Sequence, residues 1–346
     1  MSRIALFVPA PWARLSGGYA YDRRMVVGLR RAGHDVSVIA LAGRHPLADQ
    51  AAEEDAGRGL APLAPEVIPV IDGLALPAFA PHLAAITGRA IGLIHHPAAL
   101  ETGFSEADRA DLRALECRLL PRLKAVIATS PETASRLEKE FGVAPARLRV
   151  VTPGTDPAPR SMGSGGPGAA ILSVGALIPR KGHDVLLRAL APLFDLDLSL
   201  TIAGEANSDP AYAATLRDLA GELGIAAKVT FAGEVDDRTL DRLWRGADLF
   251  ALATHWEGYG MAVAEALARG LPAAICTGGA AAAQVPENAG IFAQPGDHEQ
   301  LSKALRRLIF DVELRAEMAE NAWRAGQTLP GWEAEIAAFA EALGAG

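Results

Sequence analysis

The sequence has few cysteines and no long apolar run, and both shortages limit what the protein can be. Among 346 residues only Cys117 and Cys276 are cysteines, and neither has the partners of a zinc site at a fixed spacing. Two isolated thiols exclude a disulfide framework and favour a reducing, cytoplasmic location. Apolar stretches such as 169–177 and 249–254 are much shorter than the ~20 residues that cross a bilayer, and no basic-then-apolar leader opens the chain. We therefore expect a protein that is neither secreted nor membrane-spanning.

Basic residues are also fewer than acidic ones. The net charge is −8, whereas binding to nucleic-acid phosphates needs a basic face, so we expect no nucleic-acid partner. Residues 1–150 hold 18 basic and 16 acidic side chains, and residues 151–346 hold 15 and 25. The basic groups of the first half leave two interpretations open, a peripheral contact with the inner face of a membrane and a solvated surface of paired charges. These groups are Arg23, Arg24, Arg30, Arg31, Arg109, Arg113, Arg118, Arg122 and Lys124.

Short apolar runs bounded by Gly, Pro or Asp alternate with stretches of helical spacing. This alternation predicts an α/β fold, with parallel sheets covered by helices on both faces. The expected strands are 4–8, 36–41, 67–71, 91–94, 126–129 and 148–151, followed by 170–174, 198–203, 229–232, 249–253, 273–276 and 291–293. Two sets of six strands in a chain of this length predict two doubly wound domains.

The two domains are expected at 1–155 and 169–328. More than half of the residues in 152–168 are glycine or proline, so this stretch cannot hold a helix or a central strand, and we interpret 156–168 as the linker. Helices are expected at 297–311 and 312–326. The last segment, 329–346, is expected to form a short helix from 333 to 343 that packs back on the N-terminal domain.

In sheets of this kind, ligands bind beyond the carboxyl ends of the strands, where loops lead into helix N-termini. Gly17 and Gly18 come before a helix expected at 22–32, and paired glycines there let the backbone approach a phosphate or a sugar. His95 and His96 follow the strand 91–94, with Glu101 nearby. Neighbouring side chains on a strand diverge, so a hydrogen-bonding role for the histidines is favoured over a metal site, and a structural role stays open.

Two more such loops lie in the second half. Gly175 ends a strand, and Arg180 and Lys181 then stand side by side at the start of the next helix, where a phosphate or diphosphate would offset their charge. Farther on, Glu257 lies in a glycine-containing loop and Glu265 lies on the helix that follows. Because an unpaired carboxylate among the apolar neighbours of Glu265 would be costly, we expect the two carboxylates to accept hydrogen bonds from hydroxyl groups.

The ordered combination of these motifs resembles glycosyltransferase family 4 over nearly the whole chain. Glu257 and Glu265 match that family's Glu-x7-Glu signature, with a Gly-aromatic-Gly loop and a Gly-x-Pro helix stop around it. Comparable features of the family lie at Gly17–Gly18, Thr129–Ser130, Gly175 and Arg180–Gly182. The resemblance implies the GT-B architecture, in which two Rossmann-like domains face each other across a cleft, with the donor bound by the second domain and the acceptor by the first.

The resemblance also implies a reaction and a role for each residue. A sugar would pass from a UDP- or GDP-linked donor to a hydroxyl of a glycan, a lipid or a small molecule, by front-face transfer with retained configuration and without a metal or other cofactor. Glu257 would bind donor sugar hydroxyls, Glu265 the ribose, Arg180 and Lys181 the diphosphate, and His95 the reacting sugar. His96 and Glu101 would contact the acceptor. The other implied donor contacts are Gly17, Gly18, Gly175, Glu234, Val235, Gly258, Tyr259, Gly260 and Met261.

One position departs from the family, which often has an arginine after the glycine of the Gly175 position, where this chain has Ala176. Three consequences stay open: Arg180 takes over that charge, the protein binds phosphate less tightly, or the protein uses a different donor. So do two other functions, a nucleotide-sugar-binding module without catalysis and an epimerase or phosphorylase on the same plan. A phosphorylase would need a Schiff-base lysine, and Lys181, Lys228 and Lys303 are not persuasively placed for one.

Overall fold

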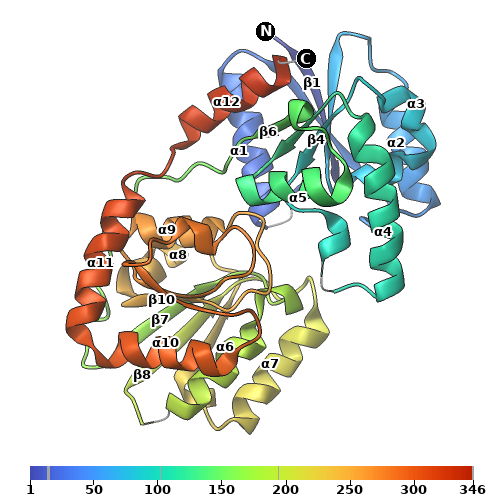
Figure 1. The fold of residues 1–346 in the computed structure, drawn as a ribbon. Helices are drawn as coiled ribbons and strands as arrows, with labels where there is room; N and C mark the ends of the chain where they lie inside the picture. The colour runs from blue at the N-terminus through green and yellow to red at the C-terminus, as the bar shows by residue number, and fades with distance from the viewer. Residues whose placement is uncertain (14–15, 102, 194, 345–346) are drawn as a thin grey trace. The chain divides into compact units, whose positions relative to one another are not determined.

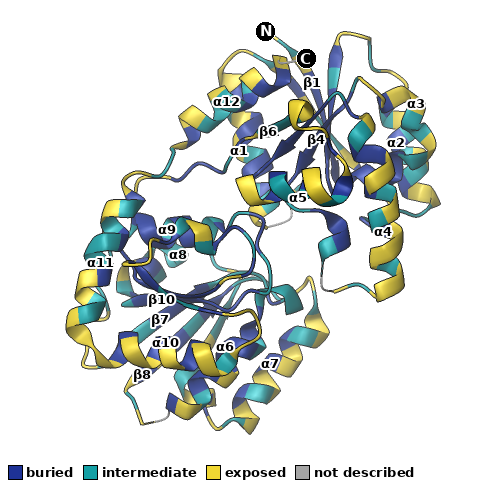
Figure 2. Cartoon of the chain, viewed as in Figure 1, coloured by how far each residue is buried: buried dark blue, intermediate teal, exposed yellow. Residues whose placement is uncertain are grey.

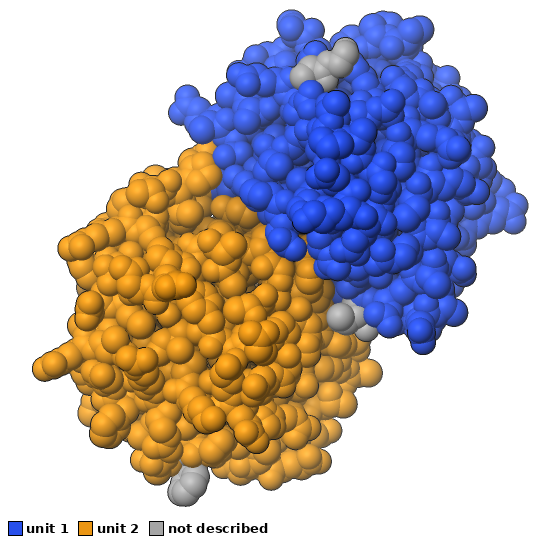
Figure 3. Space-filling model, in the orientation of Figure 1, with its two compact units in different colours: residues 1–154, 332–346 blue, residues 155–331 orange. Residues whose placement is uncertain are grey.

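The computed structural model describes residues 1–13, 16–101, 103–193 and 195–344. The chain folds into two compact units (Figures 1 and 3). Unit 1 comprises Met1–Gly154 together with Trp332–Gly346, and unit 2 comprises Thr155–Gly331. The C-terminal segment is therefore part of unit 1, although unit 2 separates it from the rest of that unit in the sequence.

Unit 1 is built on a parallel sheet of six strands in the order β2-β1-β3-β4-β5-β6. The strands are β1 (Arg3–Pro9), β2 (Asp35–Leu41), β3 (Val67–Asp72), β4 (Ile91–Ile94), β5 (Ala125–Ala128) and β6 (Leu148–Val150). The helices are α1 (Gly17–Arg31), α2 (Gln50–Leu60), α3 (Leu83–Ile86), α4 (Glu106–Leu119), α5 (Pro131–Phe141) and α12 (Trp332–Gly344), with 3₁₀ turns η1 (Leu76–His82), η2 (Ala98–Leu100), η3 (Leu120–Arg122) and η4 (Pro145–Arg147).

Unit 2 is also built on a parallel sheet of six strands, here in the order β12-β11-β10-β7-β8-β9. Its first strand, β7, lies between β8 and β10, whereas β1 of unit 1 lies between β2 and β3. The strands are β7 (Ala169–Val174), β8 (Leu198–Ala203), β9 (Val229–Gly233), β10 (Leu249–Leu252), β11 (Ala273–Cys276) and β12 (Gly290–Ala293). The helices are α6 (His183–Leu190), α7 (Pro210–Glu222), α8 (Asp237–Gly246), α9 (Met261–Ala268), α10 (His298–Phe310) and α11 (Val312–Gly326). The 3₁₀ turns are η5 (Pro179–Lys181), η6 (Ala191–Leu193), η7 (Ala226–Lys228) and η8 (Ala282–Gln284).

Burial follows the sequence pattern that predicted the two sheets. The inner strands are continuous apolar runs with every residue buried, as in β4, β5, β10 and β11, whereas the helices expose one face (Figure 2). In each unit, apolar side chains from the helices pack against the sheet and form the core. No helix in the described ranges is both long and apolar enough to cross a membrane.

Two segments differ from their sequence predictions. Helix α1 begins at Gly17 rather than at residue 22, because Ser16 caps it and accepts a hydrogen bond from the backbone N–H of Tyr19 at 3.4 Å. The stretch 156–168, interpreted as a linker, contains no helix or strand but packs along unit 2. The backbone N–H of Ser161 donates to the carbonyl of Arg269, and the next N–H donates to Arg245.

Candidate active site

The cationic loop of unit 2 begins where β7 ends. Turn η5 carries Arg180 and Lys181, and Gly182, at φ +63°, redirects the chain into α6. A Cβ at Gly182 would lie 2.1 Å from the carbonyl oxygen of Ala253, so only glycine fits this turn. The turn places both cations, half-buried, at the carboxyl edge of the sheet, where the sequence predicted a site for an anion.

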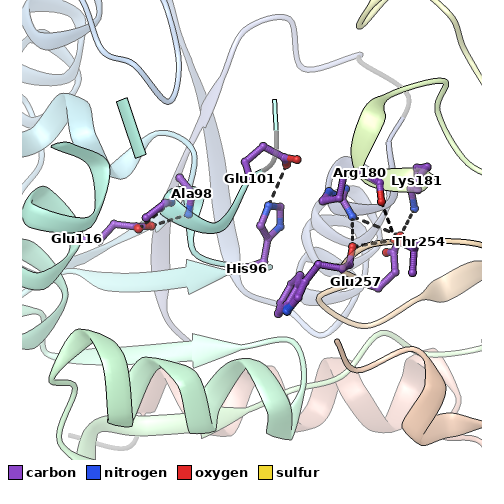
Figure 4. A network of polar contacts seen from close by, with 10 residues as sticks. His96, Ala98, Glu101, Glu116, Arg180, Lys181, Thr254 and Glu257 are labelled. Carbon is purple, nitrogen blue, oxygen red and sulfur yellow. Dashed lines mark hydrogen bonds and ion pairs between the residues drawn. The ribbon is translucent and has the colours of Figure 1, made fainter. Parts of the chain in front are cut away.

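Glu257 forms ion pairs with both cations. Its Oε1 accepts hydrogen bonds from Lys181 Nζ at 2.5 Å and from Arg180 Nη1 at 3.3 Å (Figure 4). The side chain of Glu257 is 9% exposed and those of Arg180 and Lys181 are 13% and 16% exposed, so water screens these ion pairs only in part. An anionic ligand at this place would compete with Glu257 for both cations.

Thr254 connects the loop of the cations to the loop of Glu257. Its hydroxyl oxygen is buried and lies 3.0 Å from the carbonyl oxygens of Arg180 and Trp256 and 3.3 Å from Glu257 Oε1 (Figure 4). The backbone N–H of His255 also donates to the Arg180 carbonyl, at 2.8 Å. The two loops are thus fastened to each other through backbone groups as well as through the ion pairs.

A second glycine pair, Gly278 and Gly279 after β11, supports the backbone of Glu257. The N–H of Glu257 donates to the carbonyl of Gly278 at 3.0 Å, and its own carbonyl accepts from Ala280 at 2.8 Å. A Cβ at Gly278 would lie 2.3 Å from the carbonyl oxygen of His255, so a larger residue would push the two loops apart.

The loop after Glu257 leads into α9 as the sequence predicted. Gly260, at φ +96°, is the residue before the helix, and no described side chain caps the first turn. Gly258 and Gly260 are buried, Tyr259 is half-buried, and Met261 is the first helical residue. Glu265 lies half-buried on the second turn of α9, on the helix that the Glu257 loop opens.

Gly175 and Ala176 shape the other side of this loop. A Cβ at Gly175 would lie 3.1 Å from Lys181 Cε, so the glycine leaves room for the lysine stem. The carbonyl of Ala176, the residue that departs from the family, accepts a hydrogen bond from Nε2 of the buried His183 at 3.2 Å. Burial and the charge of Lys181 lower the pKa of His183 to about 4, so this histidine stays neutral and does not replace the missing arginine charge.

Glu234 and Val235, expected near the nucleotide base, lie between β9 and α8. Glu234 is exposed and Val235 is half-buried. The carbonyl of Gly233 accepts a hydrogen bond from the backbone N–H of Gly204 at 2.9 Å, and this contact ties the end of β9 to the end of β8. Both residues therefore stand at the same edge of the sheet as the Lys181 loop.

In unit 1, His95 directly follows β4 and contacts two buried carboxylates. Its Nε2 lies 3.0 Å from Asp22 Oδ1 and 3.5 Å from Asp72 Oδ2. Asp72 is the last residue of β3 and Asp22 lies on α1, and their side chains are 5% and 2% exposed. Sequence reasoning selected His95 but neither carboxylate, because the three residues are far apart in the chain and no local motif joins them.

Charge within this cluster shifts the pKa values of its members. Burial alone would lower the pKa of His95, but the charge and hydrogen bond of Asp22, together with the charge of Asp72, outweigh burial, so the pKa is raised. Burial and the charge of Asp22 raise the pKa of Asp72 to about 7, against the opposing charge of His95. The cluster therefore favours the charged form of the imidazole.

Gly17 and Gly18 are the first residues of α1, not a loop before it. A Cβ at Gly18 would lie 3.2 Å from His95 Cδ2, so the absence of a side chain there makes room for the imidazole ring. The glycine pair was expected to admit a phosphate or a sugar. In the structure, Gly18 admits a protein side chain that was itself a predicted site residue.

His96 and Glu101 form a pair on the loop that follows β4. His96 Nε2 lies 3.2 Å from Glu101 Oε2 (Figure 4). Behind this loop, the buried carboxylate of Glu116 accepts hydrogen bonds from the backbone N–H groups of Ala98 at 2.7 Å and Ala99 at 3.1 Å. Burial raises the pKa of Glu116 to about 7 in spite of these hydrogen bonds. Glu116 thus fixes the turn η2 that directly follows the two histidines.

Among the described residues, only the Asp22, Asp72 and His95 side chains bring three potential metal-ligating atoms within 4.8 Å of one another. Here Nε2 of the ring contacts a carboxylate oxygen at 3.0 Å, which is the geometry of a hydrogen bond, and this contact favours a shared proton over a bound cation. Cys276 is buried and Cys117 is exposed, and both are free thiols, as predicted.

The sequence matches two family models. The model of glycosyl transferases group 1 matches residues 158–324, and that of Glycosyltransferase Family 4 matches residues 60–159, so together they extend over most of the chain. The chain belongs to the family 4 glycosyltransferases.

Several named proteins are similar in sequence. A D-inositol 3-phosphate glycosyltransferase of Thermomonospora curvata is 31% identical over 235 residues, which is 61% of this chain and 54% of the relative. A mannosylfructose-phosphate synthase of Agrobacterium fabrum is 31% identical over 58% of this chain and 50% of the relative. The aligned part of this family 4 glycosyltransferase thus spans about half the length of the relatives it matches.

Solved structures show the same fold along the whole chain. Sucrose-phosphate synthase from Thermosynechococcus elongatus superposes with a TM-score of 0.83 at 20% identity, over 99% of this chain and 98% of that one. Anabaena Alr3699/HepE, solved in complex with UDP and glucose, superposes with a TM-score of 0.77 at 18% identity, over 99% and 100%. With the two parallel six-stranded sheets, these likenesses give the chain the GT-B fold.

Proposed function

We propose that this protein is a retaining glycosyltransferase that transfers a sugar from a UDP- or GDP-linked donor to a hydroxyl group of a glycan, a lipid or a small molecule. The observation that carries the proposal is the cluster of Arg180, Lys181 and Glu257 at one edge of the unit 2 sheet. Two cations beside a carboxylate can hold an anionic leaving group and a sugar hydroxyl side by side. The HepE structures, solved in complex with UDP and glucose and with UDP-glucose, support a nucleotide-sugar donor.

In the proposed reaction the diphosphate gains charge as the bond to the anomeric carbon breaks. Lys181 and Arg180 stabilise that charge from a partly buried loop, where they need no metal ion to assist them. Glu257 exchanges its contact with the cations for hydrogen bonds from sugar hydroxyls, and Glu265 accepts from the ribose. We assign no carboxylate as a nucleophile: the acceptor hydroxyl attacks the anomeric carbon from the face that the diphosphate leaves, its proton passes to the leaving diphosphate, and the configuration is retained.

The remaining donor contacts belong to this proposal as well. The backbone of the loop 258–261 binds donor oxygens at the start of α9, while Gly175 accommodates Lys181 and the segment with Glu234 and Val235 receives the base. Gly17 and Gly18 contribute the first turn of α1 beside His95, which contacts the transferred sugar.

On the acceptor side, the proposal assigns a hydroxyl contact to His96 and Glu101, because the pair joins a donor and an acceptor of hydrogen bonds on one loop. We further propose a cytoplasmic location. For a lipid acceptor, the basic side chains of unit 1 would contact the membrane surface, and co-sedimentation with anionic vesicles in low and high salt tests that contact.

One observation favours a second function, a nucleotide-sugar-binding module that lacks turnover. Ala176 stands where the family often has an arginine, and the buried His183 below it is neutral. The side chain of Arg180 instead reaches Glu257 and the carbonyl of Trp256, which it contacts at 2.7 Å, and there it can take over the missing charge. We therefore favour the transferase, and turnover separates the two functions.

The test is a thermal-shift screen of the purified protein with UDP, GDP, ADP and their common sugar conjugates, with and without a chelator. A ligand that binds the folded state raises the unfolding midpoint. We expect one nucleoside diphosphate to raise it whether or not the chelator is present, and we expect Lys181→Ala and Glu265→Ala to abolish the rise. Absence of any shift at millimolar ligand would contradict the proposal.

A further inference from the structure

The Asp22–His95–Asp72 cluster has a geometry that the proposed function does not require by itself. Three neighbouring strands of the unit 1 sheet contribute to it, because α1 follows β1, Asp72 ends β3 and His95 follows β4. All three side chains therefore meet at the carboxyl edge of the sheet, where ligands bind in folds of this class.

Both carboxylates approach the same atom of the ring. Asp22 Oδ1 and Asp72 Oδ2 lie 3.0 Å and 3.5 Å from His95 Nε2. The other oxygen of Asp72, Oδ1, accepts a hydrogen bond from the backbone N–H of Leu74 at 2.8 Å, and this bond orients the carboxylate toward the ring. With a proton on Nε2 facing two carboxylates, Nδ1 is the ring nitrogen available to a ligand. The side chain of His95 is 20% exposed, so part of the ring stays open to a ligand.

The surroundings of His95 hold the ring in one orientation. Gly18 lies against the Cδ2 edge, and Tyr21 packs edge-on to the ring with centroids 5.3 Å apart. The hydroxyl of Thr129 donates to the His95 carbonyl at 3.2 Å and fixes the backbone. Tyr21 is held in turn by Trp332 and Phe339 of α12, at centroid distances of 6.0 and 6.5 Å.

We propose that Asp22 and Asp72 are positioning residues that keep the His95 imidazole charged, with Nε2 turned toward the carboxylates and the Nδ1–H presented to the transferred sugar. The proposal rests on the proposed function, because it gives the sugar contact of His95 a charge and a direction. A charged donor at this place binds an electron-rich sugar oxygen more strongly than a neutral imidazole does.

The other titratable groups that face the ring, from the elements packed against it, are compatible with a charged His95. Besides the two carboxylates, Tyr21 faces it from α1, and burial raises the pKa of the Tyr21 hydroxyl well above its ordinary range, so Tyr21 stays neutral. Glu335 of α12 acts on Tyr21, and its own pKa is raised by burial. His96, the adjacent residue, pairs with Glu101 instead.

The test combines a titration of His95 by NMR with kinetics of the full-length protein, for the wild type, Asp22→Asn and Asp72→Asn. Asp35→Asn, at the amino end of β2 in the same sheet, is the matched control. We expect each site variant to lower the pKa of His95 by about one unit or more, because a neutral amide does not favour the imidazolium. The fall of kcat at high pH should then begin at a lower pH in both site variants, while the affinity for nucleoside diphosphate stays within about twofold of the wild type.

A His95 pKa that is unchanged in both folded variants would overturn the proposal, as would a loss of kcat that is equal at every pH. A divalent metal ion that purifies with the wild type and is lost in the variants would overturn it too. The titration needs no turnover. If no sugar nucleotide is used, the proposed function fails and the NMR result still decides whether the carboxylates keep His95 charged.

Discussion

Lys181 is a partly buried cation whose protein partner is a carboxylate, and in the proposed function donor binding would replace that partner by a phosphate. Both arrangements are charge-assisted, so the cation is never left unpaired in a place where water screens it weakly. In the same proposal Glu257 would lose its cationic partners and would accept hydrogen bonds from hydroxyl groups of the bound sugar instead. The pair would thus link the binding of the diphosphate to the binding of the sugar.

Removing the charge of Lys181 tests this link. Lys181→Met keeps most of the apolar stem that packs against Gly175 and removes the ammonium group. We expect a loss of roughly tenfold or more in affinity for the nucleoside diphosphate, because a hydrogen bond to a charged group contributes about 1.5–3 kcal/mol. Calorimetric titration measures it, with the exposed Lys303→Met as control. An affinity equal to that of the wild type would show that the diphosphate binds elsewhere.

At the residue scale, the sequence predicts the groups that lie within motifs and misses those that support them. Arg180, Lys181, Glu257 and Glu265 stand in short motifs next to glycine turns, so their spacing could be read. Asp22, Asp72, Thr254 and Glu116 act over long sequence separations, and only the fold brings them to their partners. A pair of glycines directly after a strand, as at 278–279, is a further local signal of a close backbone approach.

At the scale of elements, the strands of the described residues were predictable because buried parallel strands are short apolar runs between glycine, proline and aspartate. The start of α1 was not predictable, because its glycines are typical of a loop and the helix begins there only because the side chain of Ser16 caps it. The turn η2 was also unforeseen, because its anchor, Glu116, lies on α4. Elements that long-range contacts fix are the ones that a local pattern misses.

The anchor of η2 makes the stability of unit 1 depend on pH. The pKa of Glu116 rises from an ordinary value near 4.5 to about 7 in the folded protein, so its contribution to stability is full below pH 4.5 and is lost as the pH rises toward 7. Glu116→Gln cannot ionise. We therefore expect the free energy of unfolding of the variant, relative to the wild type, to increase between pH 4.5 and pH 8, by on the order of 3 kcal/mol. Urea unfolding of the wild type and the variant at both pH values measures this change, with the exposed Glu138→Gln as control. A difference in unfolding free energy between Glu116→Gln and the wild type that is the same at both pH values would refute the raised pKa of Glu116.

Shortening a side chain on the buried face of α12 tests how much this helix contributes to the stability of unit 1. Phe339 is 2% exposed and packs against Tyr21, so Phe339→Ala should lower the free energy of unfolding by about 3–5 kcal/mol. Glu341→Ala, on the exposed face of the same helix, should change it by less than about 0.5 kcal/mol. Urea denaturation of both variants measures the difference. A cost below about 1 kcal/mol for Phe339→Ala would mean that α12 contributes little to unit 1.

At the scale of the whole molecule, two units that are each built on a parallel six-stranded sheet, with different strand orders, carry different chemistry. The edge of the unit 2 sheet has two cations balanced by a carboxylate, whereas the edge of the unit 1 sheet has a histidine between two buried carboxylates. The plan of two units follows from length and strand count, but the inclusion of α12 in unit 1 depends on the packing of Trp332 and Phe339. The division of charge between the units supports the proposal that unit 2 binds the diphosphate.

We propose above all that this chain breaks the bond between a sugar and a nucleoside diphosphate with its own cations and Glu257. The most direct measurement is the release of nucleoside diphosphate from UDP- and GDP-sugars by the purified protein in a chelator, with a panel of hydroxyl acceptors, for the wild type and Glu257→Gln. We predict release from one sugar nucleotide by the wild type, and binding with at least tenfold slower release by the variant. Tight binding of a sugar nucleotide without any release by the wild type would contradict the account and would indicate a binding module.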